Sequence, residues 1–288
     1  MIGAILAASR PISWVNTAVP FALTYLLSTE RVDWRLILGF VFFLVPYNIA
    51  MYGINDVFDY ESDIRNPRKG GVEGAVLPRS MHRPLLVASA ITVVPPAAVL
   101  FASGTPTSGV WLAVALFAVY AYSAPPFRFK EVPLLDSVTS SAHFTLPALV
   151  GATIAGEPVG PRVALALVAF FLWGMASHAL GAVQDVNADR EGGLKSVATH
   201  FGARRTTVAA AVFYFVSVLL VAGLGLSGLV VAVLGIGYTA NTLRFAGVTD
   251  ETSESVNRAW RVFLWLNYLT GAVVTISVLA RVFDAPQF

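Results

Sequence analysis

Long apolar stretches recur along the chain and limit what it can fold into. A helix needs roughly 20 apolar residues to cross a hydrocarbon core of about 30 Å. Hydrophobic residues make up 56% of the 288 residues, and mean hydropathy is +0.70, which is more apolar surface than one water-surrounded core could bury. The chain is therefore predicted to be a polytopic membrane protein in a lipid bilayer. We expect about nine spans, at residues 12–27, 34–54, 85–102, 110–122, 134–155, 163–183, 206–224, 227–245 and 260–282.

Each span is predicted to be α-helical. Two-residue alternation of apolar and polar side chains is missing, and only helices or closed barrels satisfy their backbone groups in lipid. No linker, low-complexity run or extramembrane domain is visible, so residues 1–288 are predicted to form a single all-α transmembrane domain. An Asp-rich loop follows the second predicted span and another follows the sixth. This echo is compatible with two related halves, and equally with chance.

Charge placement predicts the orientation in the cell membrane. Basic residues gather in one set of alternate connectors, and such residues are biased to the cytoplasm. The N-terminus and both Asp-rich loops are therefore expected on the cytoplasmic side. A formal charge of only +2 gives little support for nucleic-acid binding. The absence of cysteine excludes disulfides, thiolate metal sites and cysteine nucleophiles.

The first acidic cluster is Asn55-Asp56-Val57-Phe58-Asp59-Tyr60-Glu61-Ser62-Asp63. Helical spacing places Asn55, Asp59 and Asp63 on one face, with Asp56 three residues before Asp59. Stacked carboxylates weaken a helix unless a cation neutralises them. Hard oxygen ligands of this kind suit Mg²⁺, which often bridges one or two carboxylates to substrate phosphates. This cluster is therefore a candidate metal site.

A second cluster repeats the spacing. In Gln184-Asp185-Val186-Asn187-Ala188-Asp189, the pair Asp185 and Asp189 again stands four residues apart. Basic residues follow both clusters, and metal together with cations implies a polyanion such as a diphosphate. A solvated loop explains either cluster alone, and the orientation rule explains the basic residues about equally well. The candidate diphosphate ligands are Arg65, Arg68, Lys69, Tyr122, Ser123, Arg128, Lys130 and Lys195.

Polar residues inside the predicted spans form a further group. Polar groups in lipid are expensive and tend to face the bundle interior. Asn16, His143 and His178 are therefore candidates for acceptor contact, although hydrogen bonding between helices is the more common role of such residues. Aromatic residues near these positions could shield an allylic cation or face lipid.

The two acidic motifs, Gly193-Leu194-Lys195-Ser196 and the segment YSAPPFRFK at 122–130 together resemble the UbiA superfamily of intramembrane prenyltransferases. The resemblance covers nearly the whole chain. It implies nine helices around a cavity open to lipid, with both motifs binding Mg²⁺ and an isoprenyl diphosphate. It further implies metal binding or orientation by Asn55, Asp59, Asp63, Asp185 and Asp189 with support from Asp56, and diphosphate contacts by Arg65, Arg68, Lys130 and Lys195.

Residues 9–17 and 46–71 are most similar to a branch of that superfamily, the bacterial lycopene elongases. This similarity implies dimethylallyl diphosphate as donor and a hydrophobic polyene, lycopene, as acceptor. Members that prenylate 4-hydroxybenzoate carry Asp and Tyr where this chain has His178 and Gly181, and the small Gly181 would leave room for a polyene. Two alternatives stay open. The acceptor could be a quinone precursor, a chlorophyll-like ring or a glycerol phosphate lipid, or the chain could be a divalent cation transporter.

Overall fold

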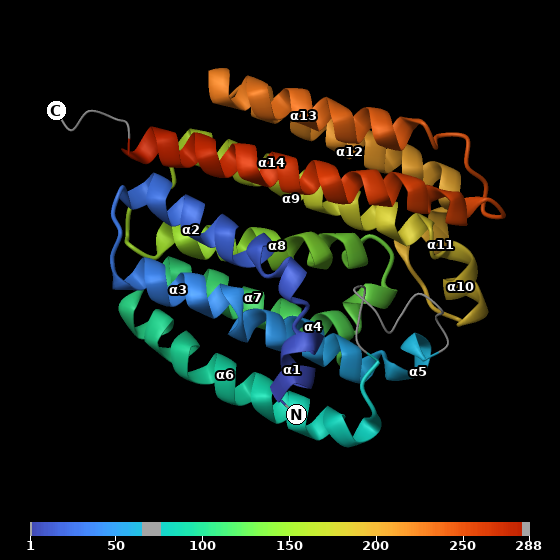
Figure 1. Cartoon of the computed structure of the whole chain (residues 1–288), viewed down its shortest axis with the longest axis horizontal. Helices are drawn as coiled ribbons and strands as arrows, with labels where there is room; N and C mark the ends of the chain where they lie inside the picture. The colour runs from blue at the N-terminus through green and yellow to red at the C-terminus, as the bar shows by residue number, and fades with distance from the viewer. Residues whose placement is uncertain (1, 65–75, 284–288) are drawn as a thin grey trace. The chain divides into compact units, whose positions relative to one another are not determined.

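The computed structural model describes residues 2–64 and 76–283 (Figure 1). In those residues all regular secondary structure is helical, as predicted. The α-helices are α1 Ile2–Ala8, α2 Val15–Thr29, α3 Trp34–Leu44, α4 Pro46–Phe58, α5 Tyr60–Asp63, α6 His82–Ser103, α7 Pro106–Ser123, α8 Leu135–Thr153, α9 Pro161–Val183, α10 Val186–Glu191, α11 Val197–Phe201, α12 Ala203–Ala222, α13 Leu226–Leu243 and α14 Asn257–Phe283. Short 3-10 turns lie at η1 Pro11–Ser13, η2 Arg79–Met81, η3 Phe129–Glu131 and η4 Ser253–Val256.

Seven helical segments within the described residues are long and apolar enough to cross a membrane. Each matches one of the predicted spans. The remaining two predicted spans, at 12–27 and 134–155, correspond to α2, which has 15 residues, and to α8. Serine, threonine and histidine lower the apolar character of α8. Multi-pass insertion is confirmed, and nine is an approximate count.

The predicted span at 34–54 is two helices in sequence. The α-helix α3 ends at Leu44 and α4 begins at Pro46, the first helical position, where a missing N–H costs no hydrogen bond. Proline also clashes with the preceding turn of a continuous helix, so the backbone changes course at Val45. The break sets the direction of α4, which carries the first acidic motif at its C-terminal end.

The chain packs as two compact units. Unit 1 comprises residues 1–128 and 143–159, and unit 2 comprises residues 129–142 and 160–288. The start of α8 therefore belongs to unit 2 and the rest of it to unit 1. The first acidic motif lies in unit 1 and the second in unit 2. That residues 1–288 act as a single domain stays a prediction.

In unit 1, α4 packs against α6, α7 and α1. A buried amide fixes it to α2 and to the end of α3. The Asn48 side chain donates to Thr17 Oγ1 and to the Phe43 carbonyl, both at 2.8 Å, and Thr17 itself donates to the Phe43 carbonyl. Such bonds satisfy backbone and side-chain groups that lipid cannot. The helix that carries Asp56 and Asp59 is thus anchored at its far end.

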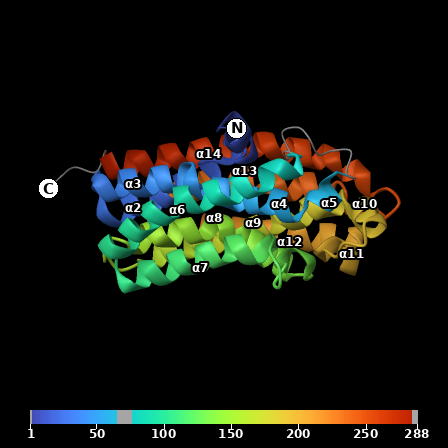
Figure 2. The same cartoon turned by 90° about the horizontal axis from the view of Figure 1, so that it is seen from below.

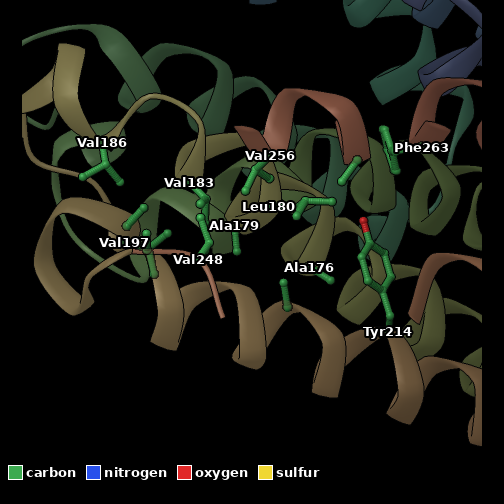
Figure 3. Close-up of a cluster of buried hydrophobic side chains, with 14 of the residues drawn as sticks. Ala176, Ala179, Leu180, Val183, Val186, Val197, Tyr214, Val248, Val256 and Phe263 are labelled. Carbon is green, nitrogen blue, oxygen red and sulfur yellow. The ribbon is translucent and has the colours of Figure 1, made fainter. Parts of the chain in front are cut away.

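In unit 2, α9 packs against α12, α12 against α13, and α13 against α14. Figure 3 shows the apolar cluster that joins these helices, with side chains from α9, α12 and the start of α14 meeting Val248 and Val256. The hydroxyl of Tyr214 donates to Ser177 Oγ at 3.0 Å inside this cluster. Figures 1 and 2 both show α10 and α11 beyond the C-terminal end of α9. The second acidic motif therefore stands at the end of a packed helix bundle.

Candidate active site

The first acidic motif lies where α4 ends and α5 begins. Asp56, Asp59 and Asp63 are buried, with 4%, 5% and 8% of their surface exposed. The Asn55 amide donates to Asp59 Oδ2 at 2.5 Å and to Ser123 Oγ at 2.8 Å. The structure thus brings Asn55 and Asp59, which are predicted metal ligands, next to Ser123, which is a predicted diphosphate ligand. Because the Asn55 nitrogen makes both of these bonds, its side-chain oxygen is not the atom that bonds Asp59 or Ser123.

Arg10 was not among the predicted site residues, yet it reaches the first motif. Its guanidinium lies 2.9 Å from Asp56 Oδ1 and 4.3 Å from the centre of the Tyr52 ring. The backbone at Arg10 is left-handed, with φ of 51°, just before the turn η1. From the sequence alone, Arg10 is only one of the basic residues that predict which side of the membrane the N-terminus faces.

Arg128 reaches the same motif from the connector between α7 and η3. Its guanidinium lies 4.0 Å from Asp59 Oδ1 and donates to the carbonyls of Ser123 at 3.3 Å and Phe58 at 3.5 Å. The neighbouring ring of Tyr122 meets His143 edge-on at 5.3 Å. Arg10 and Arg128, from two different connectors, therefore place positive charge around one group of carboxylates. This is the combination that a metal-bound diphosphate requires.

The second acidic motif continues from α9. Asp185 and Asp189 are both half-buried, and the backbone N–H of Asp189 donates to the Asp185 carbonyl at 2.8 Å, one helical turn apart. The Gln184 side chain accepts from Asn257 Nδ2 at 2.8 Å, which ties the motif to the start of α14. The predicted (i, i+4) arrangement is confirmed. Lys195 is exposed in the loop before α11.

A second contact that the sequence did not reveal holds this loop. Arg190, one residue after Asp189, pairs with Asp250 at 2.6 Å, and Asp250 also accepts from the backbone N–H of Ala203 at 2.7 Å. These donors, the Ala203 N–H first, hold the pKa of Asp250 below its ordinary 3.8. The connector between α13 and α14 therefore braces the helices that follow the second motif.

The remaining predicted residues are placed as follows. Asn16 in α2 and Lys130 in η3 are half-buried. His178 in α9 is half-buried and bonds Ser137. Gly181 packs against an indole, because a Cβ there would lie 3.3 Å from Cζ3 of Trp260. The predicted diphosphate ligands Arg65, Arg68 and Lys69 lie outside the described residues.

The donor set fits Mg²⁺ bound jointly with phosphate. Within residues 2–64 and 76–283, no three acidic or histidine side chains cluster closely enough to hold a metal by themselves. Each unit offers instead a carboxylate pair, joined in unit 1 by the Asn55 amide. Mg²⁺ commonly takes one or two carboxylates and completes its shell with substrate phosphates and water. The hard oxygens of Asp59, Asp63, Asp185 and Asp189 match that requirement.

Comparison with known proteins gives the family. The UbiA prenyltransferase family profile matches residues 17–267. The chain belongs to the UbiA prenyltransferase family. It is 57% identical over 276 residues to a lycopene elongase/hydratase of Corynebacterium glutamicum, with 96% of each chain covered. It is 54% identical to a C50 β-cyclic carotenoid biosynthesis protein of Dietzia sp. strain CQ4, covering 94% of this chain and 63% of that protein.

The UbiA fold also appears among solved structures. A UbiA homolog from Archaeoglobus fulgidus bound to DMAPP and Mg²⁺ matches with a TM-score of 0.73 at 22% identity, covering 96% of this chain and 99% of that one. The predicted family and the all-helical membrane fold are thus confirmed, and the chain is an intramembrane prenyltransferase. Which side of the membrane its motifs face stays a prediction.

Proposed function

We propose that this enzyme transfers dimethylallyl groups from dimethylallyl diphosphate to the ends of lycopene, which gives C45 and then C50 carotenoids. The observation that carries the proposal is the similarity to the Corynebacterium glutamicum lycopene elongase/hydratase. The two sequences are 57% identical over nearly the full length of both chains. The acidic and basic residues of unit 1 supply chemistry that this activity needs. We place the reaction at the cytoplasmic face of the cell membrane.

The first acidic motif and the second would share one Mg²⁺-diphosphate group. In unit 1 the metal would be held by Asp59, Asp63 and the side-chain oxygen of Asn55. In unit 2 it would be held by Asp185 and Asp189. Bound Mg²⁺ neutralises charge on the leaving diphosphate. Asp56 would support this set from its ion pair with Arg10 rather than bind metal directly. Arg128 would contact the diphosphate beside Asp59. The other proposed diphosphate ligands are Lys130, Lys195, Arg65, Arg68 and Lys69.

The protein's own residues would drive ionisation by positioning charge where it develops. Negative charge appears on the bridging oxygen as the allylic C–O bond breaks, and fixed cations such as Arg128 stabilise it without reorganising. Burial of Asp59 and Asp63 excludes water that would otherwise screen these interactions. The electron-rich terminal double bond of lycopene then attacks the allylic carbon.

The surroundings of α9 favour an uncharged acceptor. His178 is engaged by a serine hydroxyl, and Gly181 is covered by Trp260, so neither presents a fixed charge of the kind that would hold a carboxylated ring. An apolar polyene suits a site open to lipid. Asn16, His143, His178 and Gly181 remain proposed acceptor contacts on this ground.

Product mass tests the proposal. Purified protein in lipid would receive lycopene, Mg²⁺ and one of three allylic diphosphates with 5, 10 or 15 carbons. We expect C45 and C50 products with the five-carbon donor. If the enzyme prenylates a quinone precursor, a chlorophyll-like ring or a glycerol phosphate lipid and not lycopene, the proposed acceptor is wrong. The assignment as a prenyltransferase is unaffected by that result.

A further inference from the structure

A polar network crosses unit 2 where α8 begins, α9 passes and α11 begins. Asp136 has none of its surface exposed. Its Oδ2 accepts from the backbone N–H of Val197 at 2.6 Å, and its Oδ1 accepts from the backbone N–H of Ser137 at 2.6 Å and from the Ser137 hydroxyl at 3.2 Å. Ser137 Oγ lies 3.0 Å from His178 Nδ1. A carboxylate, a hydroxyl and an imidazole thus form one chain.

The Ser137 hydroxyl has one proton and two neighbouring acceptors, the carboxylate of Asp136 and Nδ1 of His178. When Ser137 donates to the carboxylate, it accepts from the N–H at His178 Nδ1. Nε2 is then the basic nitrogen of the imidazole. A carboxylate that orients a histidine through its second nitrogen is the arrangement that general bases use.

The two helices that hold this histidine are locked together one turn away. Ser141 Oγ donates to the Phe171 carbonyl at 2.6 Å, and a Cβ at Gly174 would lie 2.3 Å from Ser141 Oγ. Ser137 and Ser141 stand four residues apart on α8, as do Gly174 and His178 on α9. The imidazole is thus fixed in place, and His178 as a whole residue is half-buried.

The position of His178 relative to the second acidic motif gives its role. Asp185 follows it by seven residues, just after the end of α9 at Val183, so His178 lies roughly 10 Å back along the helix direction from the second acidic motif. That offset is comparable with the length of a diphosphate joined to a five-carbon chain. With a diphosphate held at Asp185 and Asp189, the carbon chain and the attacking alkene would lie at the depth of His178.

We propose that His178, oriented by Ser137 and Asp136, is the base that activates water to end the reaction as an alcohol. This rests on the proposed prenyl transfer. Attack of the acceptor's double bond on the allylic carbon forms a C–C bond and leaves a tertiary carbocation on the acceptor. The oxygen of one water bonds to that carbon, and a water proton moves to His178 Nε2. The products are the hydroxylated carotenoid, diphosphate and one proton, which leaves the imidazolium for solvent.

The experiment measures how much oxygen from water enters the prenylated products. The enzyme would turn over lycopene and dimethylallyl diphosphate in H₂¹⁸O, and mass spectrometry would give the ratio of ¹⁸O-alcohol to alkene among the prenylated products. His178→Asn keeps an N–H near the place of Nδ1 to bond Ser137, but has no basic nitrogen. We expect its alcohol-to-alkene ratio, measured on whatever amount of prenylated product it makes, to fall at least tenfold.

Two further variants separate the base from a structural bond. Ser137→Ala leaves His178 in place but removes the hydroxyl that orients it. The alcohol-to-alkene ratio of Ser137→Ala should therefore also fall. This variant tests the proposal even if His178→Asn does not fold. Tyr214→Phe removes a different buried bond to α9, the one to Ser177, and should leave the ratio unchanged. An unchanged ratio in both His178→Asn and Ser137→Ala overturns the proposal.

The wild-type product alone gives two further outcomes. Prenylated products that carry no ¹⁸O overturn the inference about His178 and leave the proposed prenyl transfer standing. No prenylated lycopene at all overturns the proposed function, and the role of His178 falls with it.

Discussion

The guanidinium of Arg10 lies 2.9 Å from Oδ1 of Asp56, across 46 residues of sequence. Asp56 is almost wholly buried, so this pairing neutralises a carboxylate that would be costly to bury alone. Tyr52 lies under the same guanidinium, one turn before Asp56. The turn at Arg10 therefore contacts the first acidic motif, and in the proposed site this ion pair would keep Asp56 from binding metal directly.

Replacing Arg10 tests this support. Arg10→Gln should lower turnover about 10- to 100-fold, the usual cost of removing a partner that orients a metal ligand. Arg31→Gln, a variant of an exposed basic residue elsewhere in unit 1, is the control and should keep wild-type turnover. Prenyl transfer rates at saturating Mg²⁺ give the comparison. Equal rates for Arg10→Gln and wild type would contradict a role for the ion pair.

Removing a proposed metal ligand should have a larger effect. Asp59→Ala and Asp185→Ala should each lower turnover at least about a hundredfold, because leaving-group charge is then stabilised poorly. Chelation of divalent metal should give the same loss in wild type, reversed by added Mg²⁺.

Matched controls sit beside each motif. Glu61 is exposed and pairs with Arg79, and Glu191 is exposed in α10. Glu61→Gln and Glu191→Gln remove a nearby negative charge without touching a proposed ligand. Near-normal turnover in both alanine variants would contradict the metal assignment.

The brace at Asp250 should contribute to stability in a pH-dependent way. Asp250→Asn keeps an oxygen that can accept from the Ala203 N–H but removes the charge that pairs with Arg190, which should cost up to about 1 kcal/mol. The folded-state pKa lies below the ordinary 3.8, so the stabilisation is present at neutral pH and is lost as pH falls through the folded-state pKa. Thermal unfolding of both proteins in detergent should show a gap at pH 7 that closes below about pH 4. A gap that is constant with pH would count against the brace.

The buried amide of Asn48 anchors α4 and should matter to folding. Asn48→Leu removes its bonds to Thr17 and to the Phe43 carbonyl, which we expect to cost about 1 kcal/mol, the usual range for such bonds between membrane helices. The same variant should reduce turnover less than Asp59→Ala, since it touches no proposed ligand. Unfolding midpoints and rates on one preparation would check both statements.

The sequence predicts what local spacing controls. The (i, i+4) pairs Asp59–Asp63 and Asp185–Asp189 follow from helical geometry, and the spans follow from apolar length. Pro46 could have predicted the break between α3 and α4, because proline rarely continues a helix, and Trp34–Phe58 is still one candidate span, as predicted. Arg10–Asp56 and Arg190–Asp250 were not readable, because each joins residues that only tertiary packing brings together.

In the proposed function the two acidic motifs share one diphosphate. The chain has no cysteine, so spin labels at Glu61→Cys and Glu191→Cys report a single distance between the motifs. In the enzyme reconstituted in lipid with Mg²⁺ and an unreactive diphosphate analogue, we predict a distribution centred below about 30 Å, the thickness of the hydrocarbon core. A distribution centred above that thickness would place the motifs too far apart to share a substrate and would contradict the account.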